Sequence, residues 1–228
     1  MIRPLTLVFG TLCLVFALAS CGNQPGRGLV MKSITSGALK KNQAPANADM
    51  PSQQELEANI SHALANSDKR LSIVVIEKRD SFSFLTEISQ NGPIRTWASP
   101  DRRTLSTSSG LIVATRGLGF DLMSASLPGS KALVTSRKAG QAQRVLRYLD
   151  GENQKQELRF SCRVSRGKPQ KIAIGEIRAS TITMTESCRS SGASFENTYL
   201  VDGRGRIVQS RQWLGAENSY IFWQKLRH

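Results

Sequence analysis

The chain has 228 residues and is strongly basic: 31 Lys and Arg against 17 Asp and Glu give a net charge of +14. That length is enough for one domain with a substantial core. Such a charge bears on partners and not on fold, and it favours anionic ligands. No run of five or more basic residues concentrates the charge, so a generally basic surface without a dedicated ligand stays an alternative.

The N-terminus is typical of an exported lipoprotein. Arg3 precedes an apolar run from Leu5 to Leu18, too short to span a bilayer comfortably, and the sequence Leu18-Ala19-Ser20-Cys21 follows. This tetrapeptide fits a bacterial lipobox, in which the cysteine receives a diacylglycerol and, after cleavage, an acylated amine. We therefore expect cleavage after residue 20 and attachment to the membrane through acyl chains, including palmitate, on Cys21. A transmembrane helix or a plain signal peptide with a chance cysteine is the alternative.

The export signal also bears on location and partners. Gly22 and Asn23 follow the cysteine, with no Asp to retain the protein in the inner membrane. We expect an outer-membrane lipoprotein that faces the periplasm, which makes nucleic acid, the usual partner of a basic protein, unlikely as a ligand. Removing residues 1–20 leaves 30 basic and 17 acidic residues, a net charge of +13. Residues 21–50 are rich in Gly, Asn, Ala, Ser and Lys and predict a lipidated flexible tether.

Residues 51–228 are expected to form a single domain that starts with a short amphipathic helix. Ser52 and Glu55 have capping-box spacing, and an apolar stripe recurs at helical spacing to about Asn66. The sequence then changes to a period of two. We expect strands over Leu71–Glu77 and around residues 82–88, an Asn91-Gly92 turn, and a partner strand over Arg95–Ser99.

The second half continues this pattern. Residues 156–165 alternate between apolar and polar side chains, which predicts a strand with one buried and one solvated face. We expect Gly167-Lys168-Pro169 to turn the chain into a strand over Ile172–Ile177. A further strand carries Met184 and Cys188 on one face, and a hairpin joins Phe195–Val201 to Arg206–Trp213. The predicted fold is all-β, an antiparallel meander forming a curved sheet or half-barrel, with the N-terminal helix across its concave side.

The cysteines agree with export. With Cys13 in the signal and Cys21 lipidated, Cys162 and Cys188 remain and are expected to form a disulfide in an oxidising compartment. Two free buried thiols are the alternative. A metal site is not expected, because there is no CxxC and His62 and His228 lie far from both cysteines in sequence.

The sequence offers little for catalysis, and no catalytic residue or cofactor is predicted. His62 is the only internal histidine, and no GxSxG motif accompanies it. Four acidic residues could form a carboxylate pair, although scattered acids are usually structural: Asp101, Asp121, Glu186 and Glu196. Glu186 shares a face with Ile182 and Met184, where a buried Glu beside Arg would be a structural ion pair. Gly117 and Gly119 form only half of a dinucleotide-binding loop, so a sharp bend between strands is the better interpretation.

Basic and aromatic residues gather toward the C-terminus. Arg204, Arg206, Arg211 and Trp213 are the candidate residues for binding polysaccharide or a partner, because aromatic rings stack on sugars and on arginine. The alternative is that these rings complete the hydrophobic core.

Several strings of residues resemble the YjbF/GfcB family of lipoproteins, linked to exopolysaccharide and group 4 capsule production. Besides the lipobox and the paired cysteines, they are Ser108-Ser109-Gly110-Leu111, Gly117-Leu118-Gly119-Phe120-Asp121-Leu122, Glu196-Asn197-Thr198-Tyr199, Gly205-Arg206-Ile207-Val208 and Ser210-Arg211-Gln212-Trp213-Leu214. The resemblance implies a curved antiparallel sheet and a role in exporting or assembling a surface polysaccharide. It supplies no catalytic residues.

The leading hypothesis is a non-enzymatic accessory lipoprotein for exopolysaccharide or capsule secretion, which binds acidic polysaccharide or the polysaccharide-export proteins. One alternative is a half-barrel carrier of lipid or lipidated cargo, which predicts an apolar cavity. Another is a polysaccharide-processing enzyme, which predicts a cleft with paired acids.

Overall fold

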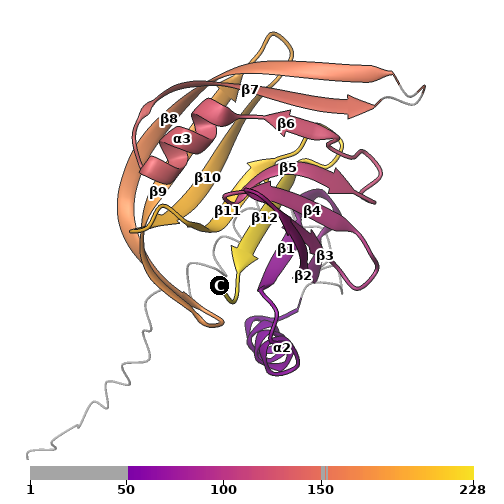
Figure 1. Ribbon diagram of the computed structural model, residues 1–228, viewed down its shortest axis with the longest axis vertical. Helices are drawn as coiled ribbons and strands as arrows, with labels where there is room; N and C mark the ends of the chain where they lie inside the picture. The colour runs from indigo at the N-terminus through magenta and orange to yellow at the C-terminus, as the bar shows by residue number, and fades with distance from the viewer. Residues whose placement is uncertain (1–50, 150–151, 153) are drawn as a thin grey trace, which may run out of the picture.

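The computed structural model describes residues 51–149, 152 and 154–228 (Figure 1). The predicted signal peptide, Cys21 and the tether to residue 50 lie outside the described residues. The helices are α2 (Gln53–Ala65), the 3-10 turn η1 (Glu77–Arg79) and α3 (Pro128–Ser136). The strands are β1 (Leu71–Ile76), β2 (Ser81–Asn91), β3 (Ile94–Ala98), β4 (Thr104–Ser108), β5 (Leu111–Arg116), β6 (Ser124–Ser126), β7 (Gly140–Leu149), β8 (Lys155–Ile174), β9 (Ile177–Arg189), β10 (Ser194–Asp202), β11 (Ile207–Trp213) and β12 (Tyr220–Lys225). Within the described part of the chain, no helix is long and apolar enough to cross a membrane.

The strands form one antiparallel sheet in the order β5-β4-β3-β2-β1-β12-β11-β10-β9-β8-β7-β6. Strands that follow each other in sequence are paired, except β5 and β6, and β1 also pairs with β12. The two edge strands nevertheless contact each other, and in the loop that joins them the Leu122 carbonyl accepts a hydrogen bond of 2.9 Å from the Thr115 amide of β5. The sheet therefore curls into a nearly closed barrel (Figure 1). The predicted antiparallel meander and curved sheet are confirmed, and the curvature goes beyond a half-barrel.

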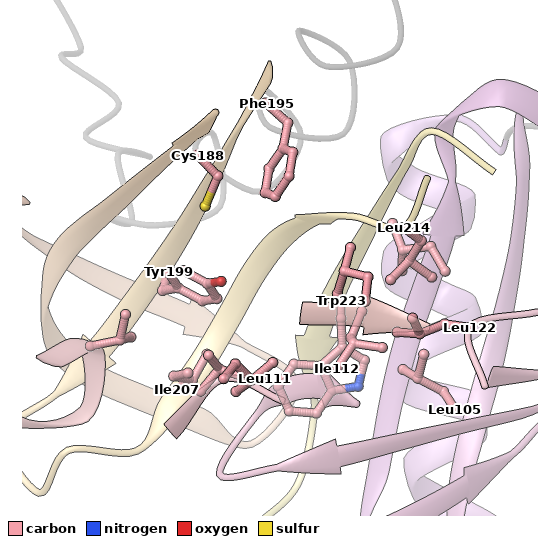
Figure 2. Packing of buried hydrophobic residues seen from close by; sticks show 14 of the residues in the cluster. Leu105, Leu111, Ile112, Leu122, Cys188, Phe195, Tyr199, Ile207, Leu214 and Trp223 are labelled. Carbon is pink, nitrogen blue, oxygen red and sulfur yellow. The ribbon is translucent and has the colours of Figure 1, made fainter. Parts of the chain in front are cut away.

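Two apolar clusters lie on opposite faces of this sheet. The inner cluster fills the barrel and includes Ile76, Trp97, Leu146, Met184, Tyr199, Ile207 and Trp223 (Figure 2). The outer cluster lies beneath α2 and contains Leu56, Ile60, Leu71, Ile73, Val75, Ile172, Ile177, Leu200, Val208, Phe222 and Leu226. Strand β1 contributes to both clusters and is buried along its whole length.

The position of α2 corrects the sequence-based expectation. Its capping box is confirmed, since the Ser52 amide donates to Glu55 Oε2 at 2.7 Å and the Glu55 amide donates to Ser52 Oγ at 3.3 Å. The helix does not lie on the concave side, however, because Leu56 and Ile60 belong to the outer cluster. The apolar outer side of β1 needs this cover. The inner cluster is covered instead by α3, whose Val134 is fully buried.

A second correction concerns β8. The predicted turn at Gly167-Lys168-Pro169 does not exist, because β8 continues from Lys155 to Ile174. The register against β9 shifts between Arg166 and Pro169, so the segment is a bulge. A bulge accommodates a proline, which has no amide hydrogen to donate, without ending the strand. The chain turns later at Gly175, whose φ is +53° and whose missing Cβ would lie 2.7 Å from the Leu226 carbonyl oxygen.

The other predicted turns are confirmed. Gly92, with a φ of +54°, lies between β2 and β3, and the turn after Asp202 joins β10 to β11. Gly117 and Gly119 also have positive φ, in the loop from β5 to β6. That loop is the bend between strands that the sequence indicated.

Candidate functional site

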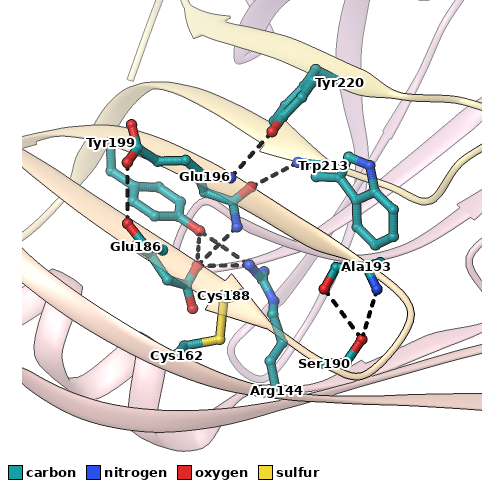
Figure 3. Close-up of a disulfide and its surroundings, with 12 residues drawn as sticks. Arg144, Cys162, Glu186, Cys188, Ser190, Ala193, Glu196, Tyr199, Trp213 and Tyr220 are labelled. Atoms are coloured by element: carbon teal, nitrogen blue, oxygen red, sulfur yellow. Dashed lines mark hydrogen bonds and ion pairs between the residues drawn. A yellow bond between two sulfur atoms is a disulfide. The ribbon is translucent and has the colours of Figure 1, made fainter.

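The disulfide prediction is confirmed. Cys162 on β8 and Cys188 on β9 are register partners with an S–S distance of 2.02 Å, and both are buried on the inner face (Figure 3). One oxygen of Glu186 lies within 4.8 Å of both sulfurs, an arrangement that suits a metal ion only when the sulfurs are free. Because the sulfurs are bonded to each other, they offer no thiolate ligands.

Glu186 is the centre of a buried polar network inside the barrel. Its Oε2 accepts hydrogen bonds from Arg144 Nη1 at 2.7 Å, Tyr199 Oη at 2.7 Å and Asn197 Nδ2 at 2.9 Å (Figure 3). The Asn197 carbonyl oxygen in turn accepts from the Trp213 amide at 2.7 Å. Burial alone would raise the pKa of Glu186, but the Arg144 charge and the hydrogen bonds outweigh it and lower the pKa. A carboxylate held ionised in this way is a structural ion pair and a poor proton donor.

The other candidate acids also have structural partners. Asp121 accepts from the Gly117 amide at 2.8 Å and from Thr115 Oγ1 at 2.9 Å, which organises the loop from β5 to β6. Asp101 is exposed and contacts Ser99 and Arg103, and Glu196 is exposed beside Ser187. His62 is exposed on α2.

The four candidate binding residues do not form one patch. Arg204 and Arg206 lie in the turn before β11, whereas Arg211 and Trp213 lie at the far end of that strand, about 17 Å away at roughly 3.3 Å per residue. Arg211 is held by Glu77 through two hydrogen bonds of 2.6 and 2.7 Å, and its guanidinium lies 3.4 Å from the centre of the Tyr220 ring.

Trp213 is part of an aromatic cluster. Its ring stacks on Phe195 with a centroid distance of 4.6 Å and an interplanar angle of 13°, and Phe160 meets it edge-on at 5.7 Å. Trp213 is only partly buried, so this cluster completes one rim of the inner core. The geometry favours the alternative that these rings belong to the core.

Arg204 and Arg206, by contrast, join three basic side chains that the sequence pattern does not indicate. Arg70 precedes β1, Arg95 lies on β3, and Lys225 ends β12. Two carboxylates, Asp202 and Glu87, lie among them, and the Lys225 charge interacts with those of Arg206, Arg95 and Arg70. We call these five basic side chains and two carboxylates the basic end of the barrel. Arg206 Nε donates to Asp202 at 2.7 Å, while Glu87 accepts from Arg95 at 2.7 and 2.9 Å and from Arg70 at 3.4 Å.

The electrostatics of two groups reflect this excess of positive charge. Burial lowers the pKa of Lys225 to about 8, helped by the charges of Arg206 and Arg95. Burial also lowers the pKa of His228, and the charges of Arg206, Lys225 and Arg204 act in the same direction. The basic end is therefore a region in which a further positive charge is disfavoured and a negative ligand is favoured.

Two apolar hollows lie elsewhere on the barrel. A cavity of about 250 Å³ is lined mostly by inner-cluster and loop residues, among them Val74, Ile76, Phe82, Leu85, Leu105, Leu118 and Ile221. A groove of about 330 Å³ contains exposed apolar side chains, with Phe120, Tyr148, Leu149, Leu158 and Leu214 in its wall. Ligand pockets are usually about 300–1,000 Å³, so neither hollow is large.

The fold and these surfaces define a β-barrel protein whose interior is filled by side chains, including the buried polar network around Glu186, and whose exposed charged groups lie on its outside and rims. The chain belongs to the YjbF family, described as group 4 capsule polysaccharide lipoprotein gfcB, whose family model matches residues 45–226. Membership makes it a lipoprotein, secreted and membrane-associated, of a family linked to capsule polysaccharide. The predicted family is thus confirmed.

A solved structure shares the fold. The hypothetical lipoprotein YmcC from Escherichia coli (K12) superimposes with a TM-score of 0.65 over 77% of this chain and 91% of its own, at 17% sequence identity. No curated protein matches the chain significantly.

Proposed function

We propose that this protein is a lipid-anchored, periplasm-facing accessory factor of the outer membrane, without enzymatic activity, that takes part in the secretion or assembly of a surface polysaccharide by binding the acidic polymer. The observation that carries the proposal is the basic end, where five basic side chains outnumber two carboxylates. An acidic polymer would supply the missing negative charge. The family, described as a capsule polysaccharide lipoprotein, supports the same ligand class.

The attraction should depend strongly on salt. Arg204 is exposed, and Arg206 keeps 39% of its side chain accessible while it contacts Asp202. Interactions between such exposed charges are screened over about 8 Å at physiological ionic strength. Binding dominated by the basic end therefore weakens as salt is raised.

The alternatives have less support from the geometry. A lipid carrier needs a large apolar cavity, but Trp97, Tyr199 and Trp223 fill the barrel interior. The apolar hollow lined by Val74, Leu85 and Leu105 measures only about 250 Å³. A processing enzyme needs two acids held in a cleft, whereas the four candidate acids are engaged in structural contacts. Binding to an export protein, in place of the polymer, is the outcome to consider if polymer binding fails.

The experiment is calorimetric titration of the chain from residue 21, with Cys21→Ser, against polygalacturonate fragments at low and physiological salt. Neutral dextran of similar length is the ligand control. We expect saturable binding to the acidic fragments that weakens with salt and falls at least severalfold in Arg204→Gln/Arg206→Gln.

A matched variant controls for net charge. Arg163→Gln/Arg189→Gln removes two exposed arginines that have no ion pair within residues the structure describes, on the outer face of β8 and β9. If both double variants lose affinity equally, binding reflects overall charge and the assignment to the basic end is wrong. No binding by the parent chain at either salt would reject polymer binding altogether.

The anchoring part of the proposal rests on the lipobox. Cys21→Ser in the full chain should abolish incorporation of radiolabelled palmitate and release the protein from the outer-membrane fraction. Retention of label in this variant would contradict lipidation at Cys21.

A further inference from the structure

Hydrogen-bond donors without acceptors gather on the inner side of the basic end. Lys225 follows Trp223 on the inner face of β12, and its register partner on β1 is Ser72, which is fully buried. In the part of the chain that the structure describes, Ser72 Oγ and Trp223 Nε1 have no hydrogen-bond partner. The Lys225 ammonium has no ion pair there either, and lies 5.6 Å from the centre of the Trp223 ring.

The nearby carboxylates cannot satisfy these donors, because they are already engaged. Asp202 accepts from the amides of Arg204 and Arg206 at 2.9 and 2.8 Å, in addition to the Arg206 side chain. Glu87 is shared between Arg95 and Arg70. Buried polar groups are normally hydrogen-bonded, and a buried charge is normally paired. A partly buried lysine surrounded by arginines is the reverse of that arrangement.

We propose that Lys225, its cross-strand neighbour Ser72 and the guanidinium of Arg95 or Arg206 form a discrete site for one carboxylate group. A carboxylate is an acceptor-only group with two oxygens, so it can receive the ammonium, the hydroxyl and an arginine fork together. Residues directly opposite on paired strands have Cβ atoms about 5 Å apart, so Ser72 and Lys225 lie side by side on the inner face. That the carboxylate belongs to a polymer rests on the proposed function, whereas the site itself does not.

The site has a pH dependence that ordinary electrostatic attraction lacks. The pKa of Lys225 is lowered to about 8, so its positive charge disappears as the pH rises through 8. The charged or titratable groups that interact with Lys225 are Arg206, Arg95, Asp202, Arg70 and His228, and Glu87 is bound to Arg95 and Arg70. Arginine stays charged in this range, and the pKa values of His228 and Asp202 are lowered, so these groups do not titrate between pH 7 and 9. Affinity for a carboxylate therefore falls above pH 8, at most about tenfold per pH unit for one linked proton.

The test is titration of the full chain in detergent with galacturonate monomer and with polygalacturonate oligomer, at pH 7 and pH 9. The wild type should bind the monomer at pH 7 and lose affinity at least fivefold at pH 9. Lys225→Met should reduce monomer affinity at least tenfold and abolish the pH dependence, and Ser72→Ala should weaken binding severalfold. Lys168→Met, which removes an exposed lysine from the bulge in β8, should bind like the wild type.

A second measurement does not depend on a substituted chain. The pKa of Lys225, followed by NMR of ¹³C-dimethylated lysines, should rise when galacturonate is added. An unchanged pKa, or wild-type affinity and pH dependence in Lys225→Met, would overturn the inference. Oligomer binding that ignores Lys225 and pH would reject this site while leaving the proposed function intact. Monomer binding at Lys225 without oligomer binding would support the site and reject the polymer.

Discussion

Replacing Glu186 by glutamine keeps the size of the side chain but removes the charge that neutralises Arg144. The two side chains are 0% and 2% exposed, and their contact is 2.7 Å. Removing one partner of a buried ion pair costs about 3–5 kcal/mol because the other charge stays buried and unpaired. For a domain of this size each kcal/mol lowers Tm by about 2–4 °C, so we expect a decrease of about 6–20 °C.

The assay is urea unfolding of a double-mutant cycle of Glu186→Gln, Arg144→Met and both together. Because the double variant buries no charge, it should be more stable than the sum of the single effects indicates, by about 2–3 kcal/mol. Glu217→Gln is the control, since its partner Lys78 and Glu217 itself are about half exposed and such pairs contribute about 0–1 kcal/mol. Additive single effects, or a cost below about 1 kcal/mol for Glu186→Gln, would refute the reasoning.

The loss of stability at acid pH gives an independent check of the same ion pair. The Arg144 charge and the hydrogen bonds hold the pKa of Glu186 below the 4.5 of an unfolded Glu, against the opposing effect of burial. The ion pair therefore stabilises the protein fully above about pH 4.5, and this contribution is lost as pH falls through the folded-state pKa. Glu186→Gln should lack this part of the acid destabilisation, measured as the difference from wild type between pH 7 and pH 3.

Three further predictions concern stability. Cys162→Ala/Cys188→Ala removes the disulfide, whose cysteines are separated by 26 positions in sequence. The chain-entropy relation predicts that the free energy of unfolding falls by about 3–4 kcal/mol, and a decrease below about 1 kcal/mol in urea unfolding would contradict it. Gly110→Ala should lower the free energy of unfolding by more than about 2 kcal/mol, because φ is +93° and the new Cβ would lie 2.7 Å from Ile207 Cβ. Gly92→Ala is the control: it has open space around the new Cβ and should lower the stability by about 1 kcal/mol. Lys225→Met should stabilise the protein at pH 7 by up to about 3 kcal/mol, since the folded-state pKa of about 8 lies below the ordinary 10.5. The destabilisation from burying the charged Lys225 is present below pH 8 and is relieved as pH rises toward 10.5, so the extra stability of the variant must shrink over that range. A difference in stability that stays constant with pH in thermal unfolding would contradict this prediction.

Local sequence signals predicted the parts of the fold that depend on near neighbours. The capping box of Ser52 and Glu55, the turn at Gly92 and the hairpin around Asp202 are set within a few residues, and all three are confirmed. The strands between residues 104 and 149 and helix α3 were not predicted. Strands β4, β5 and β6 are short, with three to six residues each. Helix α3 starts without a side-chain cap, so its stability comes from burying Val134 against the barrel. The turn expected at Gly167 failed because strand pairing with β9 outweighed the local turn preference.

Only part of the basic end could be predicted from the sequence. Arg204 and Arg206 were selected because they lie close to aromatic residues in the chain, and Arg211 and Trp213 were selected with them. The structure separates these pairs along β11 and brings Arg70, Arg95 and Lys225 to the first pair instead. Nothing in their sequence spacing indicates this, because Arg70 precedes β1, Arg95 lies on β3 and Lys225 ends β12.

The all-β class, the paired cysteines and the family resemblance can be read from the chain alone, since alternation, turn residues and short motifs are properties of neighbouring positions. The face that α2 covers, the near closure of the barrel and the charges that meet at its end follow from the folded arrangement. They depend on the pairing of β1 with β12, which joins residues about 150 positions apart, such as Ser72 and Lys225. Long-range pairing of this kind is fixed by burying both faces of the sheet together, and no local pattern encodes it.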